Sequence, residues 1–175
     1  MVLFDATVLL HVLFEHVEAP NDAHGEPITK CKERIEFLLK NLSESRVQVI
    51  LPTPVLAEVL VLAGHQRASI LASISSTYAF KIEPFDEMAA VECAELLDAA
   101  GRARKAKRGD ETKAKLKFDR QIIAIAKVHG VTTIYSDDGK FAAVARSNGI
   151  EVIGLSDLQL PPEPPQISIE FPDRS

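Results

Sequence analysis

Short apolar segments rich in β-branched residues alternate along the chain with segments whose apolar residues recur at helical spacing. The first kind predicts strands, and these lie at residues 1–4, 47–51, 79–82, 131–135 and 150–153. The second kind predicts helices, over residues 7–15, 30–43, 55–63, 66–77, 86–100, 113–129 and 139–147. Regular alternation of strands and helices predicts an α/β fold with a parallel β-sheet flanked by helices on both faces.

Proline and glycine mark several boundaries of these elements. Thr53 followed by Pro54 is typical of an N-cap and the first residue of a helix, while Gly130 and Gly149 follow helical segments as C-terminal glycines do. Four prolines at positions 161, 162, 164 and 165 predict an extended linker. We therefore expect one domain over residues 1–158 and a Pro-rich tail over residues 159–175. The segment 166–171 either adds a strand to a sheet edge or stays disordered.

The composition is that of an ordinary globular protein. The chain has 175 residues, of which 46% are hydrophobic and 26% are charged, which fits one domain and argues against wholesale disorder or a disulfide-stapled mini-protein. No apolar run is clean enough to predict a membrane span, and Asp5 interrupts the opening segment too early for a signal peptide. Cys31 and Cys93 lie far apart, so we expect two reduced packing residues in a cytoplasmic protein.

The net charge of −5 hides a basic segment. Between positions 102 and 120 there are nine basic residues and three acids, a local charge of about +6. The segment is either a solvated surface or a patch that binds the phosphates of RNA. Its basic residues are Arg102, Arg104, Lys105, Lys107, Arg108, Lys113, Lys115, Lys117 and Arg120.

Acidic residues follow two of the predicted strands directly. Asp5 comes after the first strand, and Asp137 and Asp138 come after the strand at 131–135. In an open parallel sheet, ligands bind beyond the carboxyl ends of the strands. These carboxylates are therefore candidates for a site at one rim of the sheet, although Asp5 alone could simply cap the following helix.

Two more acids stand on apolar helix faces. Glu58 is the only charged residue between positions 46 and 65, and on a helix it shares a stripe with Val55, Val61 and Leu62. Asp119 precedes Ile122, Ile123 and Ala126, which lie on the inward face of its helix. A buried ion pair could explain Glu58, and the helix dipole could explain Asp119.

Four or five carboxylates in one cleft would repel one another and raise each other's pKa unless a cation neutralised them. Hard oxygen ligands favour Mg²⁺ or Mn²⁺ over zinc, and such ions support the attack of water on a phosphate. The basic segment before Asp119 would then hold the flanking phosphates of a nucleic acid. Since aromatic residues are few, we expect recognition to rest on phosphate contacts and shape rather than on base stacking.

Four motifs in order resemble those of PIN-domain ribonucleases, especially the VapC-like toxins of toxin–antitoxin pairs, over about residues 2–158. They are Asp5-Ala-Thr7, Glu58 within residues 53–60, Asp119 within 118–126, and Ser136-Asp137-Asp138 within 135–141. The resemblance implies a single PIN-like domain that cleaves RNA, forms a homodimer and binds an antitoxin. It implies that Mg²⁺ or Mn²⁺ is held by the catalytic residues Asp5, Glu58, Asp119 and Asp138, supported by Thr7, Ser136 and Asp137.

Two other functions fit part of the pattern. A phosphatase of the haloacid dehalogenase type also has an Asp after its first strand and an Asp pair after a late one, but it leaves Glu58 without a role. A PIN-like module that binds RNA or protein without cutting would keep the fold and lose the chemistry. The histidines are scattered, and Glu83, Asp86, Glu87, Glu92 and Glu95 are typical of helix starts and solvated faces.

Overall fold

A computed structural model describes residues 1–22, 24–104 and 113–163, without the side chains of residues 100–116. Its five strands form one sheet in the order β3-β2-β1-β4-β5, and every neighbouring pair is parallel. The strands are β1 (Val2–Phe4), β2 (Val49–Pro52), β3 (Phe80–Glu83), β4 (Thr133–Tyr135) and β5 (Glu151–Ile153). Each falls on a predicted strand, so the predicted parallel sheet is confirmed.

The helices also follow the predicted pattern. They are α1 (Ala6–Leu13), α2 (Cys31–Glu44), α3 (Thr53–Ala63), α4 (Arg67–Ser76), α5 (Glu87–Arg104), α6 (Lys113–Val128) and α7 (Gly139–Ser147), with short 3₁₀ turns η1 (Gly64–Gln66) and η2 (Leu155–Asp157). The helix predicted to begin at Gln66 begins one residue later, because η1 separates it from α3. Gly130 and Gly149 adopt φ values of 63° and 79° after α6 and α7, as expected for C-terminal glycines.

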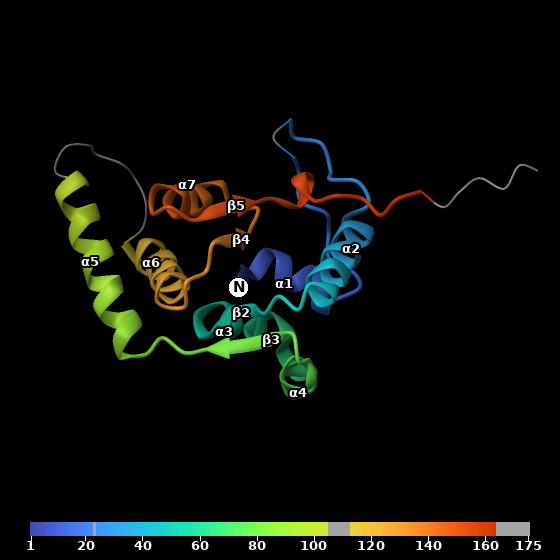
Figure 1. The fold of residues 1–175 in the computed structure, drawn as a ribbon, viewed down its shortest axis with the longest axis horizontal. Helices are drawn as coiled ribbons and strands as arrows, with labels where there is room; N and C mark the ends of the chain where they lie inside the picture. The colour runs from blue at the N-terminus through green and yellow to red at the C-terminus, as the bar shows by residue number, and fades with distance from the viewer. Residues whose placement is uncertain (23, 105–112, 164–175) are drawn as a thin grey trace, which may run out of the picture.

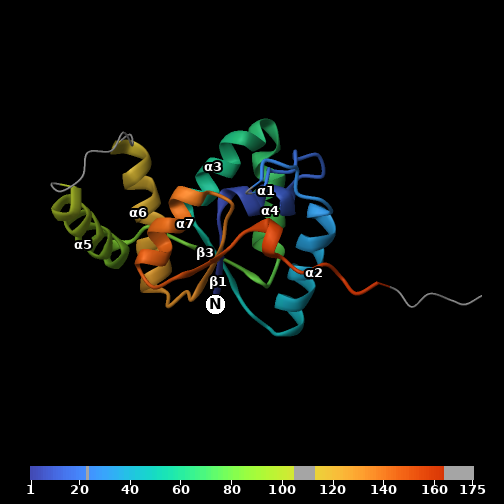
Figure 2. The ribbon, with the colours of Figure 1, turned by 90° about the horizontal axis from the view of Figure 1, so that it is seen from above.

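The helices form two groups on either side of the sheet (Figures 1 and 2). Right-handed crossovers explain the grouping: the chain moves from β1 outward to β2 and β3, then returns across the sheet to β4 and β5. The first direction places α1 to α4 on one side, and the return places α5 to α7 on the other. Helix α5 packs mainly against α6 and lies at the periphery of the molecule (Figure 2).

The central strand β1 is buried along its whole length. Leu3 pairs in register with Ile50 of β2 and Ile134 of β4, and none of these three side chains is exposed. The ring of Phe4 meets Tyr135 edge-on, with ring centroids 5.5 Å apart. Because β1 is central and immobilised on both sides, the residue that follows it, Asp5, is held in a fixed position at the rim of the sheet.

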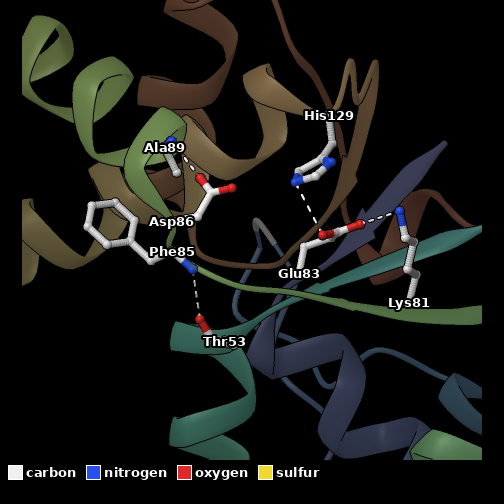
Figure 3. A network of polar contacts seen from close by, with 7 residues as sticks. All are labelled: Thr53, Lys81, Glu83, Phe85, Asp86, Ala89 and His129. Carbon is white, nitrogen blue, oxygen red and sulfur yellow. Dashed lines mark hydrogen bonds and ion pairs between the residues drawn. The ribbon is translucent and has the colours of Figure 1, made fainter.

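The start of α3 differs from the prediction. Helix α3 already begins at Thr53, and Pro52 occupies the N-cap position without a side-chain capping bond. The hydroxyl of Thr53 instead accepts a hydrogen bond from the backbone N–H of Phe85, at 3.1 Å (Figure 3). Thr53 therefore ties α3 to the segment between β3 and α5, and the N-cap prediction was wrong by one position.

The outer part of α3 is also more exposed than its sequence pattern predicts. Val61 and Leu62 are 69% and 63% exposed, although both lie near the stripe that carries Glu58. By length and composition alone, the helical stretch Thr53–Ser76 could cross a membrane. That is weak evidence for a span, because Gly64, with φ of 54°, interrupts the stretch and Val55 and Val59 are completely buried in the domain core.

The end of the domain packs against α2. Leu158 is buried, and Arg34 donates hydrogen bonds from Nη1 to the backbone carbonyls of Ser156 (3.2 Å) and Leu158.

The proposed domain boundary at residue 158 stays a prediction, and so does the Pro-rich tail over residues 159–175. The candidate strand at 166–171 lies outside the described residues. Both cysteines are buried free thiols.

Candidate active site

A cleft of about 510 Å³ lies where the β1–α1 and β4–α7 junctions meet α3 and α6. All four acids that the sequence analysis selected as ligands line it. The complete lining consists of Asp5, Ala6, Thr7, Glu58, Phe118, Asp119, Ile122, Asp138 and Phe141. Residues far apart in sequence are thus brought together at the rim that the strand order predicts.

Asp5 is the most constrained of the four carboxylates. It is 8% exposed, and its Oδ1 accepts a hydrogen bond from the N–H of Ala6 at 2.7 Å as the N-cap of α1. Its Oδ2 accepts a hydrogen bond from the hydroxyl of Ser136 at 2.6 Å. Burial raises the pKa of Asp5, and the charge of Asp138 adds to that rise, while the hydrogen bonds oppose it. The capping role considered for Asp5 is confirmed, and it coexists with a place in the cleft.

Ser136 connects the two junctions. Its side chain is 2% exposed, and its hydroxyl accepts a hydrogen bond from the N–H of Asp138 at 3.1 Å while donating to Asp5. Asp138 in turn caps α7, because its Oδ1 accepts from the N–H groups of Lys140 and Phe141 at 2.9 and 3.0 Å. One serine therefore fixes the spacing between the carboxylate after β1 and the carboxylate after β4.

Asp137 turns away from the cleft, although it neighbours Asp138. Its Oδ1 accepts a hydrogen bond from the N–H of Leu155 at 2.8 Å, and its own N–H points toward the Thr7 hydroxyl at 3.5 Å. Burial raises the pKa of Asp137, an effect that the Leu155 bond and the nearby His11 oppose. Asp137 thus fixes the turn after β4 against the turn after β5, and of the two neighbours only Asp138 lines the cleft.

Glu58 and Asp119 come from two helices that contact each other, α3 and α6. Glu58 is exposed, whereas Asp119 is 7% exposed. Ile122, Ile123 and Ala126 are all buried, so Asp119 does lie on the inward face of α6. The sequence pattern located both acids, but it predicted more burial for Glu58 than the structure shows.

The donor set suits a hard divalent cation, because every acid in the cleft offers carboxylate oxygens. Burial is the main cause of the raised pKa of Asp5, and the nearby charge of Asp138 adds to it. Among the described residues, however, no three His, Cys, Asp or Glu side chains already converge as a metal-binding group. The chemistry of the residues therefore fits Mg²⁺ or Mn²⁺, while their arrangement does not define a coordination shell.

The basic segment is described only in part. Lys105, Lys107 and Arg108 lie outside the described residues, as do the side chains of Arg102, Arg104, Lys113 and Lys115. Lys117 is exposed, as an RNA contact requires. Arg120 is only 8% exposed, and its Nη1 finds no hydrogen-bond partner within the described part of the chain. Arg120 lies close enough to α5 for its charge to lower the pKa of Cys93, which burial raises, and being buried it does not present a phosphate-binding surface.

A second polar cluster lies at the end of β3, outside the cleft (Figure 3). Glu83 is 7% exposed and pairs with Lys81 at 2.5 Å and His129 at 3.4 Å. Asp86 caps α5 by accepting from the N–H of Ala89 at 2.9 Å. The capping prediction for Asp86 is confirmed, whereas the solvated position predicted for Glu83 was wrong. Lys81 lies two residues before Glu83 on the same face of β3, but the pairing with His129, which follows α6, could not be read from sequence.

The sequence analysis did not identify the apolar side of the cleft. Ala6, Phe118, Ile122 and Phe141 line it together with the acids. Phe118 and Ile122 are one helical turn apart on α6 and flank Asp119, which is a pattern that could have been read from the sequence. No histidine lines the cleft. His11 instead lines a second cavity of about 330 Å³ between α1 and α2, and burial lowers its pKa.

Comparison with known proteins gives a consistent result. The family model described as PIN domain matches residues 28–147, whereas no curated protein matches the chain. A crystal structure of VapBC2 from Rickettsia felis bound to a DNA fragment from their promoter shares 14% identity, covers 88% of this chain and 98% of its own, and has a TM-score of 0.58. DNA-bound VapBC from Salmonella typhimurium shares 14% identity over 88% of this chain and 97% of its own, with a TM-score of 0.54.

A third similar structure is that of a toxin. VapC20 from Mycobacterium tuberculosis, a toxin that cleaves the sarcin–ricin loop, shares 19% identity over 82% of this chain and 94% of its own, with a TM-score of 0.50. At these identities the likeness establishes the fold. Since the family model also covers more than half of the sequence, the chain belongs to the PIN-domain family.

Proposed function

We propose that the protein is a metal-dependent endoribonuclease, and that it acts as the toxin of a type II toxin–antitoxin system. The observation that carries the proposal is the gathering of Asp5, Glu58, Asp119 and Asp138 around one cleft, from four separate parts of the chain. The PIN-domain family is the second support. A haloacid dehalogenase-type phosphatase is disfavoured, because it leaves Glu58, which lines the cleft, without a role.

The four acids would hold Mg²⁺ or Mn²⁺, which supplies charge stabilisation to phosphate oxygens and activates water. The chain's own contribution is to position the ligands. Ser136 orients Asp5 and the backbone of Asp138, and Asp137 holds the turn that carries both Ser136 and Asp138. Such supporting hydrogen bonds fix ligand geometry and strongly affect metal affinity.

RNA, an antitoxin and a second copy of the chain are the proposed partners, in the cytoplasm. Exposed Lys117 is carried by α6, the helix that carries Asp119, and offers a cation to an RNA phosphate on the surface of that helix. The similar structures from Rickettsia felis and Salmonella typhimurium are VapBC structures, which supports an antitoxin. Exposed apolar side chains on α3 and α4, including Val61, Leu62 and Leu71, support a protein interface such as that of a homodimer.

The test is a calorimetric titration of Mn²⁺ into the wild-type protein and two variants, followed by RNA cleavage. Glu58→Gln removes a carboxylate from the cleft, and Glu95→Gln removes an exposed one on α5 as the matched control. We expect Glu58→Gln to lose at least tenfold in Mn²⁺ affinity and to lose Mn²⁺-dependent cleavage of single-stranded RNA. Glu95→Gln should match the wild type in both assays.

Two results would contradict the proposal at different levels. If the wild-type protein bound no Mn²⁺, with or without RNA, the acids would be structural and the metal-dependent mechanism would fail. If Mn²⁺ bound at the cleft but no RNA were cut, the protein would be a PIN-like binding module without nuclease activity.

A further inference from the structure

The cleft has an apolar side that metal binding does not explain. Carboxylates contribute the polar side, whereas Phe118, Ile122 and Phe141 of α6 and α7 contribute apolar side chains to the lining. Contact with such side chains gives no favourable free energy to a hydrated cation or to a phosphate group. The apolar side must therefore accommodate another part of whatever enters the cleft, since burial of apolar surface is favourable only against an apolar partner.

Phe118 is the residue on this side that offers an accessible ring. Ile122 and Phe141 are 3% and 2% exposed, so their side chains belong chiefly to the core. Phe118 is partly exposed and precedes Asp119 directly on α6. Among the described residues, no other aromatic side chain both lines the cleft and retains substantial exposure.

The lining of the cleft places this ring near the proposed reaction centre. Phe118 and Asp119 both line the cleft, so a phosphate held there shares it with an aromatic ring. Ile122 lies one turn after Phe118 on α6 and extends the apolar side. The cleft volume of about 510 Å³ is also in the range of pockets for small organic groups, roughly 300–1,000 Å³.

The low aromatic content alone argued against base stacking, but the position of one ring in the cleft changes that expectation. We infer that Phe118 stacks against the nucleobase of a nucleotide that adjoins the scissile phosphate. The inference rests on the proposed ribonuclease function and adds a specificity-determining residue to it. An RNA chain joins an anionic phosphate and an aromatic base within one nucleotide, which matches a cleft with a carboxylate side and an aromatic side. A base must be unstacked from its neighbours to use such a ring, so the substrate at this position is single-stranded or looped RNA.

The experiment measures single-turnover cleavage by the full-length protein with Mn²⁺ on two matched single-stranded RNAs. One carries all its bases, and the other carries abasic nucleotides on both sides of the mapped cleavage position. Phe118→Leu keeps an apolar side chain and removes the aromatic face, whereas Phe118→Tyr keeps the ring. Phe14→Leu is the control, because Phe14 is equally half-buried but lines the second cavity.

On the intact RNA, we expect Phe118→Leu to lower kcat/KM by roughly 5- to 150-fold, the range that loss of one stacked base implies. Phe118→Tyr and Phe14→Leu should stay within about twofold of the wild type, a spread well below one stacking contact. On the abasic RNA the wild type should fall to the level of Phe118→Leu, and the variant should lose nothing further, because both changes remove the same contact. Mn²⁺ affinity should be equal in all four proteins.

Equal cleavage of the intact RNA by the wild type and Phe118→Leu would overturn the inference and leave the proposed function standing. The apolar side would then serve a protein partner or the core. A loss of the same size on both RNAs would also overturn it, since the defect would be structural. If the wild type cut neither RNA, the proposed function itself would fail, and the inference with it.

Discussion

Replacing Ser136 with alanine removes the hydroxyl that joins the two halves of the cleft. In the wild type this hydroxyl donates to Asp5 at 2.6 Å and accepts from the N–H of Asp138 at 3.1 Å, and it is almost completely buried. A hydrogen bond to a charged group contributes about 1.5–3 kcal/mol, and one between neutral groups about 0.5–1.5 kcal/mol. Alanine can form neither hydrogen bond, so the carboxylate of Asp5 and the N–H of Asp138 both lose a partner. We therefore expect Ser136→Ala to lower the free energy of unfolding by about 2–4 kcal/mol at pH 7.

The assay is urea unfolding of metal-free protein, with the midpoint converted to a free energy at unchanged slope. The loss should shrink as the pH falls through the raised pKa of Asp5, because a neutral carboxyl group accepts a weaker hydrogen bond than a carboxylate. Ser147→Ala is the control: Ser147 is exposed at the end of α7, and its hydroxyl makes only local hydrogen bonds, donating to the carbonyl of Val144 and accepting from the side-chain amide of Asn148. It should cost less than about 0.5 kcal/mol. A loss for Ser136→Ala no larger than that of the control would refute the assigned role.

Three further predictions concern stability. Asp5→Asn should raise Tm of the metal-free protein at pH 7 by roughly 2–4 °C per kcal/mol of repulsion and burial cost relieved. In the wild type, the raised folded pKa means that Asp5 contributes its full stability below its unfolded pKa of 3.8 and loses that contribution as the pH rises through the folded pKa. Thermal melts across pH should therefore show a gain in Tm at pH 7 and none in acid. Gly154→Ala places a Cβ 3.0 Å from Oδ1 of Asp137 and should cost about 1–3 kcal/mol in urea unfolding, whereas Gly139→Ala, which meets nothing within 4 Å, should cost nothing. Arg120→Met removes a buried cation with an orphaned nitrogen and should leave the free energy of unfolding unchanged or raise it by about 1–2 kcal/mol; a marked loss would mean that the guanidinium is well paired.

The sheet could be predicted from sequence because its signals are local. Strands such as β2 are short apolar runs buried on both faces, and the helices between them have clear periodicity. The four acids could also be selected from sequence. Strand order carries the residue after β1 and the residue after β4 to the same rim, and Glu58 and Asp119 stand on apolar helix stripes. Local pattern and strand order thus sufficed for the fold and for the acidic side of the cleft, but not for its apolar side.

The sequence could not show which way a side chain points within a short turn or at the contact between two helices. Asp137 and Asp138 are adjacent and chemically identical, and only the hydrogen bond from Leu155, 18 residues later, shows that Asp137 turns outward. Arg120 belongs to a basic run by composition, yet one step around α6 takes it from the cleft to the contact with α5. Both outcomes depend on packing between elements that are distant in sequence.

The contacts around the cleft show how each of its acids is held in place. Asp5 and Asp138 are each used twice, as caps of α1 and α7 and as members of the acidic cluster, so their positions are fixed before any ligand arrives. Glu58 lines the same cleft from the exposed surface of α3 and does not cap a helix. Replacing Asp5 or Asp138 would therefore remove a helix cap together with a carboxylate, so a lost function would have two explanations. Glu58→Gln changes the charge of the cleft without removing a cap, and it is for that reason the sharpest single test of a metal cluster.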